Sequence, residues 1–307
     1  MNVNQEKLLD LLINDETALE TAREHLEIDF SSGDAFSPSI KVKEESILNN
    51  STADERIIGF LNERSRRSRK RKFERKIKSG DYEEVIISEG DSWFQFPVFL
   101  KDVIDHLSSY EEYAIRSFGH GADWLSNIVE QAEFINHIRY HKARFFLISG
   151  GGNDLLQSER IKEMLVAGDQ SIQHPAEYFK NDKREEIMGQ LKTLYARLFS
   201  RLNRLFPDLN ILCHGYDYAI PTDQRWLGGP MEELGIPQGF RSEIVQILMD
   251  SFYDMLEDLE VSFNNVHVID NRNTVGPDEW FDELHPRNFA FLKVAENFRR
   301  KIEELRS

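Results

Sequence analysis

The sequence predicts an α/β fold, with a mostly parallel β-sheet covered by helices on both faces. Two observations support it. From residue 84 onward, short apolar runs alternate with helical stretches, which is the order that successive βαβ units produce. Each apolar run is rich in Val, Ile, Leu or Phe and is followed by Gly, Asp or Asn, as expected for buried parallel strands. The predicted strands are residues 84–88, 112–117, 144–149, 209–214 and 266–270.

The predicted helices lie between these strands and after the last one. Four of them cover residues 97–108, 123–138, 184–205 and 240–260. A final helix follows Pro286, where apolar residues recur every three or four positions. In open sheets of this kind, ligands bind beyond the carboxyl ends of the strands. The loops that follow the strands are therefore where catalytic residues are expected.

The N-terminal part of the chain has a different texture, which predicts two domains, residues 1–80 and residues 81–307. Short helical stripes occur at 8–13 and 57–61. Residues 29–55 are rich in turn formers and lack clear periodicity, which predicts a loop or partial disorder. The first domain is thus expected to be a polar extension that is helical or partly disordered.

Composition excludes several classes of protein. The 307 residues include 54 acidic and 38 basic side chains, a formal charge of −16, which disfavours a general nucleic-acid binder. The one cysteine, Cys213, cannot form an intramolecular disulfide, which suits a reducing compartment. The first residues lack a signal-peptide pattern, and no apolar run is long enough to span a membrane. We therefore expect a soluble, cytoplasmic protein.

The charge is unevenly distributed. Residues 64–78 contain ten Lys or Arg and one acid, a net charge of +9, which leaves −25 for the rest of the chain. One interpretation is an electrostatic contact with nucleic acid, anionic lipid or an acidic partner. The other is a solvated helix lying against the acidic body of the same protein. We favour the second, because charge runs are common and this one has a single aromatic residue rather than an interleaved series.

Three of the predicted strands are followed by short motifs of glycine and polar residues. Residues 90–92 (Gly-Asp-Ser) follow the first strand and bring the Ser92 hydroxyl to the rim of the sheet. Residues 119–121 (Gly-His-Gly) follow the second, and their glycines let backbone N–H groups approach a ligand. Residues 152–154 (Gly-Asn-Asp) follow the third and can direct the Asn153 amide into the crevice. Each motif taken alone is weak evidence, because ordinary turns and helix caps use the same residue types and are more frequent.

A fourth motif begins the last helix. Asp282 precedes His285 by three residues, and Pro286 follows. A carboxylate at this spacing can accept a hydrogen bond from the imidazole and so fix its tautomer. No Gly-x-Ser-x-Gly elbow surrounds Ser92, which disfavours an α/β-hydrolase.

Together, in this order, the four motifs resemble the conserved blocks of the SGNH hydrolases, also called the GDSL lipase and esterase family. The resemblance covers roughly residues 83–306. It implies a flavodoxin-like, three-layer α/β/α fold with a five-stranded, mostly parallel sheet, here carrying the N-terminal extension. It also implies that Ser92 is the nucleophile, His285 the general base and then acid, and Asp282 the residue that orients His285.

The resemblance further implies an oxyanion hole, which stabilises the charge of a tetrahedral intermediate. Its donors would be the backbone N–H groups of Ser92 and Gly121 and the side-chain amide of Asn153, with Gly119 as the competitor of Gly121. The candidate substrate-binding residues are His120, Asp154, Tyr216 and Tyr218. His120 is equally compatible with a pocket wall, and the segment that holds Tyr216 and Tyr218 is equally compatible with a packed aromatic turn. We expect no metal and no cofactor, because the histidines form no zinc-binding spacing.

Other residues near these motifs have open roles. Trp93 is expected to pack under the site, and Asp217 could bind substrate hydroxyls. Glu283 either faces solvent or, if turned inward, raises the pKa of His285. Residues 215–239 are rich in Gly and Pro and form a candidate lid or specificity loop.

The leading functional hypothesis is a serine esterase that cleaves carboxylic esters with short acyl or acetyl groups, on a small molecule or a glycan. A second hypothesis keeps the same residues but makes the protein an acyltransferase or a thioesterase. A third is a non-enzymatic interaction protein that works through its basic arm, residues 64–78. The presence of all the motif residues disfavours the third hypothesis, whereas the fold alone would not.

Overall fold

The computed structural model describes residues 26–34, 37–42, 54–96, 99–121, 123–222 and 226–306. The predicted helical stripe at 8–13 and the start of the predicted helix at 97 lie outside these ranges. No helix within them combines the length and the apolar character needed to cross a membrane. A cytoplasmic location stays a prediction.

The body of the molecule is built on a five-stranded sheet in which every neighbouring pair is parallel. The strand order is β4-β3-β5-β6-β7, so the chain winds first to one side of β3 and then to the other. The strands are β3 (Glu84–Gly90), β4 (Tyr113–Ser117), β5 (Phe145–Ser149), β6 (Asn210–His214) and β7 (Val266–Ile269). All five predicted strands are present, and the predicted fold class is confirmed.

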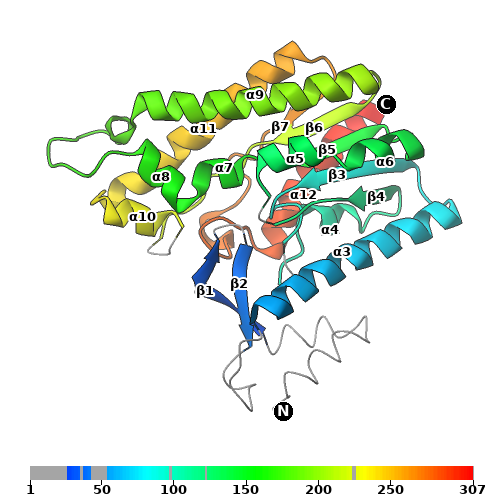
Figure 1. Ribbon diagram of the computed structural model, residues 1–307, viewed down its shortest axis with the longest axis horizontal. Coiled ribbons are helices and arrows are strands. Elements are labelled where there is room, and N and C mark those ends of the chain that lie inside the picture. The colour runs from blue at the N-terminus through cyan, green and yellow to red at the C-terminus, as the bar shows by residue number, and fades with distance from the viewer. Residues whose placement is uncertain are drawn as a thin grey trace.

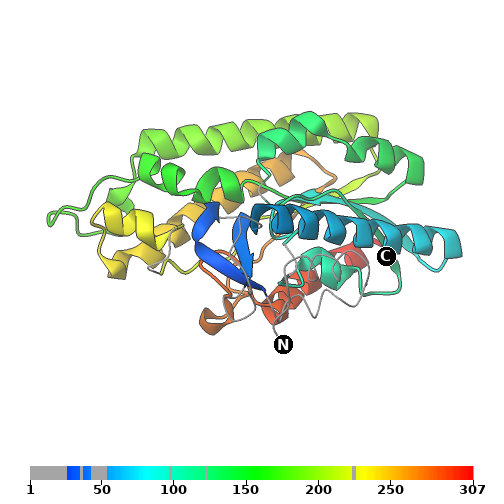
Figure 2. The ribbon, with the colours of Figure 1, turned by 60° about the horizontal axis from the view of Figure 1, so that its bottom comes forward.

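Helices cover both faces of the sheet and one edge (Figures 1 and 2). Helices α5, α6, α9 and α11 lie on one face, α4 and α12 lie on the other, and α3 runs beside β4 at the edge. The helices are α3 (Asp54–Ser79), α4 (Val103–Leu107), α5 (Leu125–Gln131), α6 (Phe134–His141), α7 (Gly152–Leu156), α8 (Ser158–Met164), α9 (Asn181–Leu205), α10 (Gly228–Glu233), α11 (Gln238–Ser262) and α12 (Asn288–Arg306), with short 3₁₀ turns η2 (Pro175–Tyr178) and η3 (Pro277–Glu279).

Two predictions of local structure are wrong. The helix predicted over 123–138 is two helices, α5 and α6, because Ala132 takes a left-handed conformation with φ 44° and ends α5. Residues 29–55 contain a β-hairpin, β1 (Leu26–Asp34) paired antiparallel with β2 (Ser37–Val42), and the first residues of α3. Apolar residues alternate with polar ones at 26–30, which is the period of two that a strand requires.

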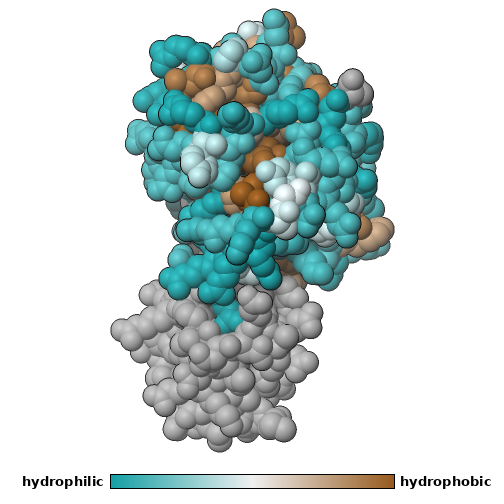
Figure 3. Space-filling view, turned by 90° about the vertical axis from the view of Figure 1, so that its right-hand side faces the viewer, coloured by the Kyte–Doolittle hydropathy of each residue, from teal (hydrophilic) through white to brown (hydrophobic). Residues whose placement is uncertain are grey.

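Helix α3 carries the whole basic run and packs against the body of the same chain. Its inward side buries Phe73, which is 4% exposed, and Arg69. The Lys76 ammonium donates hydrogen bonds to the carbonyl oxygens of Tyr110, Glu111 and Tyr113, each at 2.8 Å. Seen from the side of the molecule that lies at the right of Figure 1, the coloured surface is mostly hydrophilic, with a few hydrophobic patches (Figure 3). The boundary predicted at residue 80 thus follows a helix that is joined to the sheet by buried contacts.

Candidate active site

Ser92 lies in the turn that follows β3, at the carboxyl edge of the sheet. The turn requires a glycine at position 90, because a Cβ there would lie only 2.6 Å from the Ser149 carbonyl oxygen. This close approach lets the Asp91 N–H donate to the same oxygen at 3.1 Å, so β3 and β5 stay paired up to the turn. The Ser92 side chain is buried at the point where the two strands end.

The side chains of Ser92, His285 and Asp282 form a continuous chain of hydrogen bonds. His285 Nε2 lies 2.8 Å from Ser92 Oγ, and His285 Nδ1 lies 2.9 Å from both carboxylate oxygens of Asp282. A carboxylate only accepts, so Nδ1 carries the imidazole proton and Nε2 is left to accept from the serine. This arrangement can remove the Ser92 proton and so generate a nucleophile.

Several hydrogen bonds hold the turn that presents His285. Asp282 Oδ1 accepts the backbone N–H groups of Leu284 and His285, each at 2.8 Å. The Trp93 indole N–H donates to the Leu284 carbonyl oxygen at 3.1 Å, and Trp93 is 1% exposed, in keeping with the packing role predicted for it. The tryptophan therefore joins the loop of Ser92 to the loop of His285.

The candidate oxyanion donors follow three adjacent strands, β4, β3 and β5. Within the described ranges, no backbone hydrogen bond from the N–H of Ser92 or of Gly121 is found. One amide hydrogen of Asn153 is donated to the Asp123 carbonyl oxygen at 2.6 Å, which leaves the other hydrogen for a ligand. Asn153 is placed by α7, which begins after Gly151, a residue whose φ of 91° favours glycine.

Gly119, the competitor of Gly121, has a packing role. A Cβ at position 119 would lie 2.9 Å from the Gly90 carbonyl oxygen, so only glycine lets the two loops approach this closely. The same close approach of the two loops lets the His120 N–H donate a hydrogen bond to the Gly90 carbonyl oxygen at 2.8 Å. The His120 side chain is exposed and lines a cavity of about 380 Å³ together with Glu89 and Arg66.

Tyr216 differs from its predicted role in substrate binding. The side chain is 2% exposed, and its hydroxyl donates to Asp91 and accepts the Gly152 N–H at 3.0 Å. Asp91 also accepts the Ser149 hydroxyl at 2.7 Å. Burial raises the pKa of Asp91, and these hydrogen bonds oppose the rise. Tyr216 therefore joins the loop of Ser92 to the loop of Asn153, as the packed-turn interpretation of this segment expects.

Asp154, also predicted to bind substrate, makes a hydrogen bond to the start of a helix. One of its carboxylate oxygens accepts the Leu125 N–H at 3.1 Å, at the start of α5. Burial raises the pKa of Asp154 to about 6, although the hydrogen bond from Leu125 opposes the rise. The residue thus joins the third motif to the helix that follows the second.

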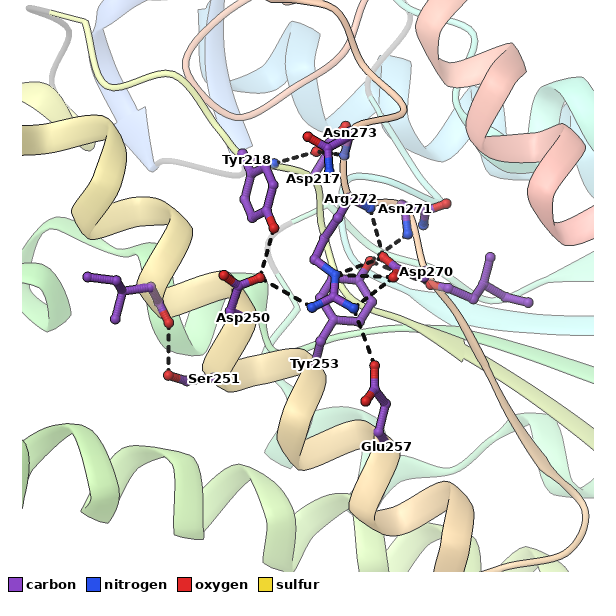
Figure 4. A network of polar contacts seen from close by, with 12 residues as sticks. Asp217, Tyr218, Asp250, Ser251, Tyr253, Glu257, Asp270, Asn271, Arg272 and Asn273 are labelled. Atoms are coloured by element: carbon purple, nitrogen blue, oxygen red, sulfur yellow. Dashed lines mark hydrogen bonds and ion pairs between the residues drawn. The ribbon is translucent and has the colours of Figure 1, made fainter. Parts of the chain in front are cut away.

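Tyr218 and Asp217 belong to a polar network after β6 (Figure 4). The Tyr218 hydroxyl donates to Asp250 at 2.8 Å, and burial together with this bond raises the pKa of Tyr218 to about 12. Asp250 also pairs with Arg272 at 3.2 Å. The Asp217 carboxylate accepts the N–H groups of Tyr218, Asn273 and Val275 at 2.6–2.7 Å. Asp217 is therefore occupied in joining two loops, rather than facing substrate hydroxyls as expected.

Glu283 is buried, so the interpretation in which it faces solvent is wrong. Its carboxylate accepts the backbone N–H groups of Trp226, Leu227 and Gly228 at 3.1, 2.9 and 2.9 Å, and the Thr222 hydroxyl at 3.3 Å. The side chain therefore points away from solvent and fastens the start of α10 to the turn of His285. The candidate lid, residues 215–239, is attached to the site through this carboxylate.

Comparison with known proteins identifies the fold. No model of a known protein family matches the sequence, and no curated protein matches it. Among solved structures, the lipase Lip_vut3 from a goat rumen metagenome is similar with a TM-score of 0.51 at 17% identity, covering 71% of this chain and 96% of that one. An extracellular lipase from Streptomyces rimosus is similar with a TM-score of 0.50 at 11% identity, covering 69% and 98%. The chain has an SGNH hydrolase-like fold, as its motifs predicted.

Proposed function

We propose that the protein is a serine hydrolase that cleaves carboxylic esters. The observation that carries this proposal is the hydrogen-bonded series Ser92–His285–Asp282, with both Ser92 and His285 completely buried at the carboxyl edge of the sheet. The similarity of the fold to two lipases adds support. The motifs that resemble the SGNH hydrolases lie at the same carboxyl edge of the sheet as this hydrogen-bonded series.

In the proposed mechanism, His285 Nε2 takes the proton of Ser92 as Oγ attacks the ester carbonyl carbon. The carbonyl oxygen becomes negatively charged and would be stabilised by the N–H groups of Ser92 and Gly121 and by the Asn153 amide. Collapse of the intermediate breaks the ester bond, and His285 gives its proton to the departing alcohol. Water then attacks the acyl-serine by the same route and releases the acid.

The role of Asp282 is electrostatic. Its two oxygens lie at equal distances of 2.9 Å from Nδ1, so the carboxylate stabilises the positive charge that His285 gains in each transition state. The chain as a whole carries −16, which favours neutral or cationic esters over polyanions. We propose esters with short acyl or acetyl groups as substrates.

The test is covalent labelling of the serine together with turnover of an aryl ester. A fluorophosphonate probe should label the wild type and a Ser126→Ala control, but not Ser92→Ala. Hydrolysis of p-nitrophenyl acetate should fall by roughly 10⁶-fold in Ser92→Ala or His285→Ala, the loss expected when a member of such a triad is removed. Wild-type protein that is neither labelled nor active on acetyl, butyryl and thioester substrates would exclude the proposal.

A further inference from the structure

Arg69 is a buried basic residue of α3, and it reaches the loop that follows Ser92. It is 8% exposed. Its Nη1 donates to the Phe94 carbonyl oxygen at 2.7 Å and to Gln95 Oε1 at 3.0 Å. Its Nη2 pairs with Asp102 at 2.5 Å. An arginine is suited to this position because its planar fork donates to several acceptors at once.

Asp102 extends this contact toward the triad. Besides Arg69, it accepts the Phe96 N–H at 2.9 Å and the Ile104 N–H at 3.0 Å, so it caps α4 and anchors the end of the serine loop. The Phe96 ring then meets the His285 ring edge-on, with 4.7 Å between centroids. A series of direct contacts therefore runs from α3 to the imidazole.

The charge of Arg69 is fixed in this setting. Burial acts to lower the pKa of the guanidinium, but the carboxylates of Asp102 and Asp105 outweigh burial and raise it. Asp105 completes the set by accepting from Arg69 Nε at 3.0 Å. The guanidinium keeps its charge and is bonded to the buried Asp102 and to the partly exposed Asp105. It therefore has little freedom to move, and it restrains the backbone that it binds.

We propose that Arg69 is a positioning residue for Ser92 and His285, and that α3 is thereby part of the active enzyme rather than a separate arm. This inference rests on the proposed function. Positioning matters because displacing a reacting group by about 1 Å can cost on the order of 10²-fold in rate. The hydrogen bonds described for Arg69 go to the serine loop and to Asp102 and Asp105, so it acts on Ser92 through the loop 93–96.

The test uses full-length Arg69→Lys and Arg69→Met, with Phe73→Leu as the control. Phe73 is buried on the same side of α3, so its truncation loosens the helix without removing a bond to the serine loop. With p-nitrophenyl acetate, we expect kcat to fall about 100-fold in Arg69→Met and less in Arg69→Lys, which keeps the charge, with KM nearly unchanged. Phe73→Leu should lose thermal stability and keep kcat.

Arg69→Lys is the variant that keeps the test decisive if Arg69→Met does not fold. The inference is overturned if a folded Arg69 variant, assayed well below its melting temperature, retains wild-type kcat. It is also overturned if Phe73→Leu loses kcat to the same extent at equal stability. Failure of the proposed function would look different, because the wild type itself would then show no turnover dependent on Ser92.

Discussion

Two buried glutamates, each close in sequence to a proposed catalytic residue, differ in what surrounds their carboxylates. Glu283, two residues before His285, accepts three backbone N–H groups and a hydroxyl. Glu89, three residues before Ser92, accepts one N–H among the described residues, from Gly90 at 3.0 Å. Burial raises the pKa of both, that of Glu89 to about 8, while the backbone bonds at Glu283 oppose the rise. The number of hydrogen bonds donated to a buried carboxylate decides whether the ionised group stabilises or destabilises the folded protein.

The largest effect is expected at Glu283. Glu283→Ala leaves the N–H groups of Trp226, Leu227 and Gly228 buried without an acceptor, and each such group costs about 1–3 kcal/mol. The free energy of unfolding, measured by urea denaturation, should therefore fall by about 3–9 kcal/mol over the three N–H groups. Glu257→Ala, which removes an exposed partner of Arg272, is the matched control and should cost less than about 1 kcal/mol. Equal losses in the two variants would contradict this account of Glu283.

A smaller effect of opposite sign is expected at Glu89, and it depends on pH. The folded-state pKa of about 8 exceeds the ordinary value of 4.5, so the unfolded chain loses this proton first as the pH rises. Wild-type stability is then present in full below pH 4.5 and declines up to pH 8. Glu89→Gln keeps an acceptor for Gly90 and cannot ionise.

Glu89→Gln should accordingly match the wild type near pH 5 and exceed its free energy of unfolding by a few kcal/mol, roughly 3–5, at pH 8.5. Urea denaturation at the two pH values measures the difference. Glu233→Gln, which changes an exposed carboxylate paired with Lys162, serves as the control and should show no such divergence. A Glu89→Gln stability gain that is the same at both pH values would refute the assignment of the raised pKa.

The two glutamates also show what could be predicted from this sequence. The strands were predicted to within about two residues because each is a run of apolar residues bounded by turn formers. Ser92 and His285 were predicted to act together because the motifs that contain them resemble those of the SGNH hydrolases, and their side chains lie 2.8 Å apart. A short sequence motif that follows a predicted strand can therefore indicate that its residues lie at the carboxyl edge of the sheet.

Residues whose partners are distant in sequence could not be predicted. Glu283 binds residues 55–61 positions away, and Arg69 binds Asp102, 33 positions away. In the sequence, Arg69 is one of ten basic residues, and only the packing of α3 separates it from its neighbours. The end of α5 at Ala132 could not be predicted either, because the pattern of apolar residues is the same whether an alanine is helical or left-handed.

The smallest effect is expected on the outward side of α3, where the basic residues are not needed to hold the helix in place. Arg75 and Lys78 are exposed, in contrast to the buried Arg69. Changing both to Gln should alter the free energy of unfolding by less than about 0.5 kcal/mol and leave ester turnover unchanged. The measurement is urea denaturation alongside the p-nitrophenyl acetate assay.

The same double variant tests whether this outward side binds a polyanion. We expect the wild type to show no affinity for single-stranded RNA, duplex DNA or anionic vesicles at 150 mM salt, because the charge of −25 outside residues 64–78 opposes a polyanion that approaches the helix. Binding that weakens steeply between 50 and 200 mM salt, and that Arg75→Gln/Lys78→Gln diminishes, would contradict this expectation. Such a result would give α3 two separate tasks, with Arg69 acting on the proposed active site and the outward residues on a partner.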